Sequence, residues 1–236
     1  MAYRTTTARV ERDQQLREHI LACAHAQVAA GGFAALTMQG LAAEAGIATG
    51  SLYRHFSRKG ELASEVFARA SQREVDALAA VFGAPGSPCE RLLAGVRGFA
   101  ERAWHSRQLA FALIAEPVEP EVDEQRLRFR EAYAQLFASL LEEGQRLGQF
   151  QVDSLSLSAA CLVCAIAEAL VGPLSPAARA ARESGEPSMD LAAVSQGLSN
   201  FCLRAVGAQL PLNIQSLESQ PLESQPVQSQ PVEIAR

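Results

Sequence analysis

The sequence has little of the alternating Val, Ile and Thr pattern that is typical of β-strands, and long stretches of it contain no proline. It is rich in alanine and leucine, and its apolar residues recur at helical spacing. These features predict an all-helical protein that needs no β-sheet. With 236 residues, the chain is large enough to bury one substantial core or two small ones.

The N-terminal segment "MAYRTTTARVERDQQ" lacks the apolar core of a signal peptide, and the five cysteines form an odd, scattered set. Both features indicate a protein of the reducing cytoplasm. The most apolar stretch, Leu155 to Val171, includes Glu168 and ends at Gly172 and Pro173. We expect a buried helix there and no membrane span.

Cys161 and Cys164 form a C-x-x-C pair, so a helical thiol or redox protein is the alternative function to weigh. No second Cys or His pair accompanies them, and they lie within an apolar helix, whereas redox chemistry uses the start of a helix after a strand. The histidines also lack the spacing of metal ligands. We therefore expect small buried thiols, no metal site and no cofactor.

The net charge of −5 hides an asymmetry along the chain. Residues 1–60 contain seven basic and four acidic side chains, whereas the rest contains fourteen basic and twenty-two acidic ones. A basic end on an acidic protein favours a polyanionic partner, because the basic end attracts phosphates while the acidic body limits unspecific binding.

Three helices are predicted in this basic region. The first spans residues 12–30 and is closed by two glycines; the second begins at Thr37 as N-cap and ends at a turn containing Gly46. The third covers Thr49 to Phe56. A helix, a glycine-containing turn and a second exposed helix are typical of the helix-turn-helix, whose second helix enters the major groove of DNA.

The third helix separates into two faces. Leu52 and Phe56 lie on one side and, with Ile47, can hold the helix on its neighbours. The other side has no acidic residue; it is made of Thr49, Gly50, Ser51, Tyr53, Arg54 and His55. Arg54 can donate a bidentate pair to guanine, and Tyr53 can bind a phosphate. Gly50 allows a close backbone approach, and Lys59 in the next helix can hold a phosphate.

The segment "LTMQGLAAEAGIATGSLYRHFSRKGELASEVF" resembles the DNA-binding signature of the TetR (tetracycline-repressor) family of bacterial transcription regulators. The resemblance implies that Thr49, Ser51, Tyr53, Arg54, His55 and Lys59 face DNA and that Thr37 binds a phosphate. Three positions depart from the family pattern: Ala48 replaces a common capping Ser, Thr49 a common Lys, and Gly60 a usual acidic residue. The first two bear on affinity and site choice.

We predict three regions: a helix-turn-helix DNA-binding domain with an N-terminal arm (residues 1–60), a helical regulatory and dimerisation domain (61–208), and a low-complexity Ser/Gln/Pro tail (209–236). A single helix-turn-helix domain binds DNA weakly, so we expect two copies in a dimer. The predicted dimer seam follows spacings of three and four residues; it consists of Leu191, Val194, Leu198, Phe201 and Ala205. Packing of this seam within one subunit is the alternative.

The middle helices carry most of the large apolar side chains, and the resemblance implies a ligand cavity among them. The candidate pocket residues are Phe99, Trp104, Phe111, Phe129, Tyr133, Phe137 and Glu168. Core packing is the alternative for each aromatic. Glu168, an acid in an apolar helix, either forms an ion pair, faces the subunit interface or meets a ligand. For Arg126, Arg128 and Arg130, the alternatives are a solvated helix face and a second anion site.

These observations together predict a cytoplasmic, ligand-responsive regulator without enzymatic activity. It binds a palindromic operator in double-stranded DNA as a homodimer, acts as a repressor, and is released by a small apolar or amphipathic ligand. It has no membrane partner.

Overall fold

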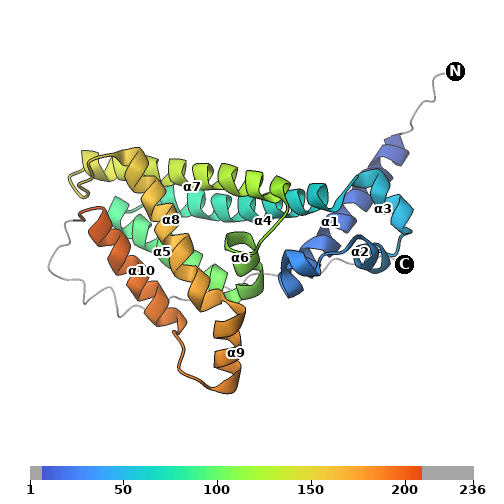
Figure 1. Ribbon diagram of the computed structural model, residues 1–236. Helices are drawn as coiled ribbons and strands as arrows, with labels where there is room; N and C mark the ends of the chain where they lie inside the picture. The colour runs from blue at the N-terminus through green and yellow to red at the C-terminus, as the bar shows by residue number, and fades with distance from the viewer. Residues whose placement is uncertain (1–6, 209–236) are drawn as a thin grey trace.

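The computed structural model describes residues 7–208, and within that range the chain is all α-helical, as predicted. Figure 1 shows the first three helices at one end of the molecule, and α8 and α10 toward the other. The predicted Ser/Gln/Pro tail lies outside the described residues. The helices are α1 (Thr7–Ala35), α2 (Met38–Glu44), α3 (Thr49–His55), α4 (Lys59–Phe82), α5 (Pro88–His105), α6 (Arg107–Ile114), α7 (Pro120–Arg146), α8 (Leu155–Leu174), α9 (Pro176–Ser184) and α10 (Leu191–Ala205).

Helix α1 runs beyond the predicted end at residue 30. Gly31 stays helical, and the break comes one residue later at Gly32, whose φ of 74° and ψ of −178° are not helical. Helical turns then resume up to Ala35. The two-glycine signal therefore marks a kink, because only the second glycine leaves the helical region.

Helix α9 follows α8 after a single residue and begins at Pro176. Pro176 occupies the first turn of the helix, where its missing N–H costs nothing, and Ser175 caps it by accepting a hydrogen bond from Ala178 N at 3.1 Å. Proline disrupts a helix when it falls in the interior, but in the first turn it is tolerated, and Pro176 therefore begins α9.

Two apolar cores share helix α4. Its first half places Leu62, Val66 and Phe67 in a core with α1, α2 and α3, and its second half places Leu78 and Phe82 in a core with α5, α7, α8 and α10. The first core also contains Ala112 of α6 and Val122 of α7. The boundary predicted after residue 60 therefore stays a prediction, since α4 continues through it and α6 and α7 pack against both regions.

Helix α8 is long and apolar enough to cross a membrane by length and composition, with 28% of its most apolar window buried. Leu162, Ile166 and Leu170 face the larger core, whereas Leu157 and Glu168 are exposed. The expectation of a buried helix is therefore only half right, because one face of α8 remains uncovered in the single chain.

Candidate functional site

Helix α2 and the turn after it have the local geometry expected of the sequence. Thr37 is the N-cap, and its Oγ1 accepts a hydrogen bond from Gly40 N at 3.1 Å. Gly46 has a φ of 66°, and Ile47 N donates to Ala42 O at 2.9 Å across the turn. A residue with a Cβ rarely adopts this φ, so glycine sets the angle between α2 and α3.

Helix α3 is held by its apolar side. Leu52 and Phe56 are fully buried in the first core, and Ile47 packs against that core. Ala48 is the N-cap and makes no side-chain hydrogen bond, so the capping that a Ser would provide does not pass to Thr49, which is already inside the helix. The start of α3 is therefore held by packing and backbone hydrogen bonds alone.

The polar side of α3 presents hydrogen-bond donors, and at Gly50 no side chain covers the backbone. Tyr53 is 49% exposed, Arg54 is exposed, and a Cβ built on Gly50 would meet no atom within 4 Å. Thr49 and Ser51 are half-buried, and Ser51 Oγ accepts a hydrogen bond from Arg54 Nη2 at 2.9 Å. No acidic residue belongs to this helix. An anionic groove can therefore approach it without repulsion from its own side chains.

His55 does not lie on the exposed face predicted for it. Its side chain is only 7% exposed, and its Nε2 lies 3.8 Å from Asp13 Oδ1 on α1. His55 is the last residue of α3, and Asp13, its ion-pair partner, belongs to α1. Its position favours a role in holding α3 in place.

Lys59 and Arg58, at the start of α4, are both paired with acidic residues near the start of α7. Lys59 Nζ lies 3.0 Å from Glu119 Oε1, and Arg58 Nη1 lies 3.2 Å from Glu121 Oε1. Gly60 fits under the same loop, since a Cβ there would lie 2.7 Å from Glu121 Oε2. A side chain at position 60, where the family usually has an acid, would require the Glu121 carboxylate to shift.

Helices α1 and α4 are joined by arginine–carboxylate pairs beneath the exposed face. Arg17 donates to both carboxylate oxygens of Glu65, and its guanidinium lies 4.7 Å from the centre of the Phe56 ring. The pKa of Glu65 is lowered, chiefly because Arg17 donates a hydrogen bond to its ionised form. Arg69 similarly pairs with Glu18. These pairs hold α1 against α4, and Arg17 also contacts Phe56 at the end of α3.

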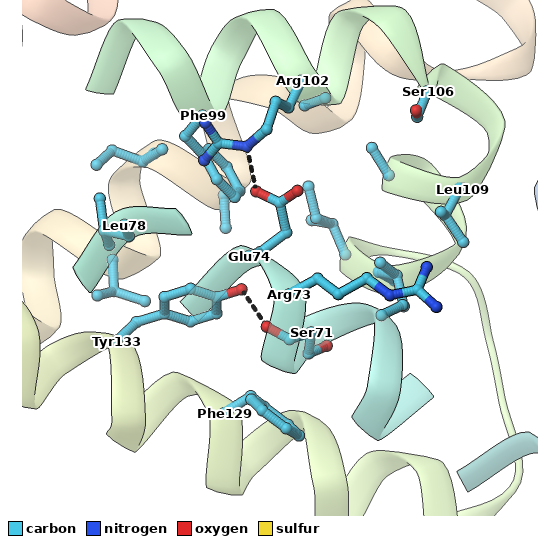
Figure 2. A pocket seen from close by; sticks show the side chains of 18 of the residues that line it. Ser71, Arg73, Glu74, Leu78, Phe99, Arg102, Ser106, Leu109, Phe129 and Tyr133 are labelled. Carbon is cyan, nitrogen blue, oxygen red and sulfur yellow. Dashed lines mark hydrogen bonds and ion pairs between the residues drawn. The ribbon is translucent and has the colours of Figure 1, made fainter. Parts of the chain in front are cut away.

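A cavity of about 570 Å³ lies among α4, α5, α6, α7 and α8 (Figure 2). Phe99, Phe129, Tyr133 and Phe137 of the predicted pocket set line it. Trp104 and Phe111 do not line it; Trp104 is nearly buried with Arg107 and Arg182 at 4.6 and 5.0 Å from its ring centre. Glu168 does not line it either, because it is exposed on the opposite side of α8.

Polar groups cross this cavity; Tyr133 among them belongs to the predicted pocket set, whereas Ser71, Glu74 and Arg102 were not predicted from the sequence. Figure 2 shows Arg102 Nε donating to Glu74 Oε2 at 2.9 Å and Tyr133 OH donating to Ser71 O at 3.3 Å. Burial raises the pKa of Tyr133 above its ordinary range. Arg73 and His25 also line the cavity. Polar residues on long amphipathic helices give no sequence signal that separates a cavity wall from a solvated face.

The predicted dimer seam divides between two sides of α10. Val194 and Leu198 are buried in the protomer's own core, whereas Phe201 is 47% exposed and Ala205 is exposed. Leu191 packs at the edge of that core. The uncovered side of α10 adjoins α8 and forms a shallow apolar groove, lined by Ala165, Ala169, Met189, Ala193, Val194, Gly197, Leu198 and Phe201.

Cys161 and Cys164 are exposed on this side of α8, so the expectation that both thiols are buried is wrong for the single chain. Their spacing places them on the flank that turns away from Leu162 and Ile166. Cys202 is buried, and burial raises its pKa to about 12. Among the described residues, no group of three or more His, Cys, Asp or Glu side chains is placed to hold a metal ion.

Comparison with known proteins places the helix-turn-helix in a family. Residues 20–66 match the model of bacterial regulatory proteins of the tetR family, while no curated protein sequence matches significantly. FadR from Bacillus subtilis, solved with stearoyl-CoA, is similar with a TM-score of 0.65 and 16% identity over 80% of this chain and 98% of that one. NemR from E. coli in its reduced form is similar with a TM-score of 0.62 and 18% identity over 79% and 96% of the two chains.

Proposed function

Because the chain belongs to the TetR family of bacterial transcriptional regulators, which are DNA-binding proteins and not enzymes, we propose that it is a homodimeric, ligand-responsive repressor acting in the cytoplasm. Its operator is palindromic, and a small amphipathic ligand in the cavity releases it from DNA. The exposed face of α3 is the observation that carries the proposal.

The DNA contacts are assigned to α3 and the two helix starts that flank it. Arg54 and Ser51 read base edges, Tyr53 binds the phosphate backbone, and Gly50 lets the helix approach the groove. Thr37 and Lys59 bind phosphates at the starts of α2 and α4. Thr49, at the start of α3, lies beside these groups, whereas the enclosed His55 positions the helix.

The homodimer is assigned to the uncovered side of α8 and α10. Leu157, Met189 and Phe201 are large apolar side chains that are each about half exposed or more in the single chain. A second copy related by a two-fold axis would cover the same patch on both chains and complete a four-helix bundle. Glu168 lies on this side of α8, so the proposal assigns it to the interface in preference to the ligand.

The test is a footprint of the full-length protein on genomic fragments that include its own promoter. We expect protection of two half-sites about one helical turn apart, as for other helix-turn-helix dimers, and an affinity that falls steeply as the salt concentration rises. Salt-insensitive binding, or no protected site on any fragment, would overturn the proposal.

A further inference from the structure

The lining of the cavity is basic, although the protein as a whole has a net charge of −5. Four arginines line the cavity against two glutamates, and the rest of the wall is mostly apolar. The surplus of positive charge therefore belongs to this site and does not follow from the overall composition.

Two of the four arginines are already satisfied by the protein. Arg102 is paired with Glu74 across the cavity (Figure 2). Arg126 donates from Nε to Leu113 O at 3.1 Å and from Nη2 to Glu116 O at 2.9 Å, and its Nη1 pairs with Asp123. These two guanidiniums hold the walls of the cavity together and have little capacity left for a ligand.

Arg73 and Arg130 are different, because neither has a carboxylate partner among residues 9–208. Arg73 Nη1 lies 3.4 Å from His25 Nε2, and the pKa of His25 is lowered, first by burial and then by Arg73 itself. An imidazole is neutral or cationic, so His25 does not neutralise the charge of Arg73. Both arginines are exposed, so they lie where the cavity opens to solvent.

The apolar wall lies deeper than these two arginines. Phe67 and Phe129, with ring centres 6.1 Å apart, line the cavity together with Val96, Phe137 and Ile166. In Figure 2, Arg73 extends from α4 away from the Glu74–Arg102 pair. The cavity thus combines an apolar interior with a positively charged opening.

We propose that the cavity selects an amphipathic anion: an apolar body against the aromatic wall, and one carboxylate, sulfate or phosphate group at Arg73, with Arg130, the second exposed arginine of the lining, adding positive potential. The inference rests on the proposed function only in treating the cavity as the effector site. Because His25 belongs to α1, the anionic group would lie beside the helix that supports the DNA-binding face.

The test uses titration calorimetry of the full-length protein with three probes that share one chain: decanoate, decanol and decyltrimethylammonium, the two ions below their micellar concentrations and decanol below its solubility limit. We expect decanoate to bind about tenfold or more tightly than decanol, and the cation most weakly, because a charge-assisted hydrogen bond is gained only by the anion. Decyl sulfate and decyl phosphate then show which anionic group is preferred.

Arg73→Met and Arg130→Met keep the length of the side chain and remove the charge. We expect both to weaken decanoate binding, Arg73→Met by about tenfold, while decanol binding stays unchanged. Arg128→Met is the matched control, since Arg128 is exposed on α7 and does not line the cavity. Equal affinities of the wild-type protein for decanoate and decanol, or equal losses for both probes in Arg73→Met, would overturn the inference.

The same preparation is footprinted without ligand, so that the two proposals fail separately. A protected operator without anion preference overturns this inference alone. Anion preference without any protected site overturns the proposed repressor and leaves the ligand class standing.

Discussion

The carboxylate of Glu116, which follows α6, accepts a hydrogen bond from Phe33 N at 2.8 Å, and its other oxygen accepts one from Ala34 N at 2.9 Å. Glu116 is only 9% exposed. The two N–H groups begin the last helical turn of α1 after the kink at Gly32, so they have no partner within that turn. This contact joins the cavity region to the DNA-binding helices, because Arg126, which lines the cavity, donates to Glu116 O.

Glu116→Gln is expected to destabilise the protein. An amide has one acceptor oxygen, so one of the two N–H groups loses its partner, and we expect a loss of about 1–3 kcal/mol in the free energy of unfolding. Urea denaturation at fixed protein concentration measures it. Glu131→Gln is the control, since Glu131 is exposed on the next helix. Equal midpoints for the two variants would show that the contact contributes nothing.

Gly32→Ala is expected to destabilise more than Gly46→Ala. Both glycines have positive φ, 74° and 66°, and forcing an alanine into that region costs about 1 kcal/mol or more. Only at Gly32 would the new Cβ also meet a neighbour, Glu116 Oε2 at 2.4 Å, whereas nothing lies within 4 Å at Gly46. Thermal unfolding of both variants compares them. A larger loss at Gly46 would contradict the tight fit between Gly32 and Glu116.

Arg54→Ala and Tyr53→Ala are expected to separate base reading from phosphate binding. Arg54→Ala should cost about 1–3 kcal/mol on the operator and relax the preference at one base pair, because a bidentate guanine contact is lost. Tyr53→Ala should weaken binding to the operator and to unrelated DNA by the same factor. Competition binding against single-base operator variants measures both effects. Identical loss of discrimination in the two variants would refute these assignments.

The sequence was sufficient for the fold class and for most of the helix-turn-helix, because those rest on local signals. The roles of Gly46, Leu52 and Phe56 follow from the local sequence. Gly46 adopts a positive φ in the turn, and Leu52 and Phe56 form the apolar face of α3 at helical spacing. His55 shows the limit of this reasoning. It lies on the polar side of α3 by its helical spacing, but in the fold its side chain is only 7% exposed and lies near Asp13 of α1, and no local sequence pattern indicates such a tertiary contact.

Tertiary contacts also decide the cavity and the C-terminal surface. Phe129 and Trp104 are both aromatic residues within predicted apolar helices, yet only Phe129 lines the cavity. Which of them reaches the cavity depends on how α7 and α5 pack against their neighbours. Val194 and Phe201 belonged to one predicted seam, but α10 lies against the core on one side only, so the two residues face different partners.

Glu119→Gln is expected to strengthen DNA binding. Glu119 holds the Lys59 ammonium at 3.0 Å in the free protein, and both side chains are about a third exposed, so the pair is worth about 0.2–1 kcal/mol. Removing the acid frees Lys59 for a phosphate, and the affinity should rise by at most about fivefold at low salt. The gain should fade as salt screens the pair. Fluorescence anisotropy across a salt series measures it.

Two variants serve as controls for Glu119→Gln. Glu121→Gln releases Arg58 instead, and shows whether any freed cation at this loop has the same effect. Combining Glu119→Gln with Lys59→Met should abolish the gain. A gain that persists in the double variant would mean that Glu119 repels DNA directly and does not compete for Lys59.

Phe201→Glu is expected to dissociate the homodimer. Phe201 is 47% exposed in the single chain and borders the apolar groove between α8 and α10, so a second copy would enclose it. A two-fold axis would then bury two unpaired carboxylates in one interface, at a cost of several kcal/mol. Light scattering after size exclusion should give the monomer mass.

Leu127→Glu is the control, because Leu127 is 64% exposed on α7, away from this groove. A single helix-turn-helix domain binds DNA weakly, so operator affinity should fall in Phe201→Glu, which loses the dimer, and should stay unchanged in Leu127→Glu. A dimer that survives Phe201→Glu would place the interface elsewhere.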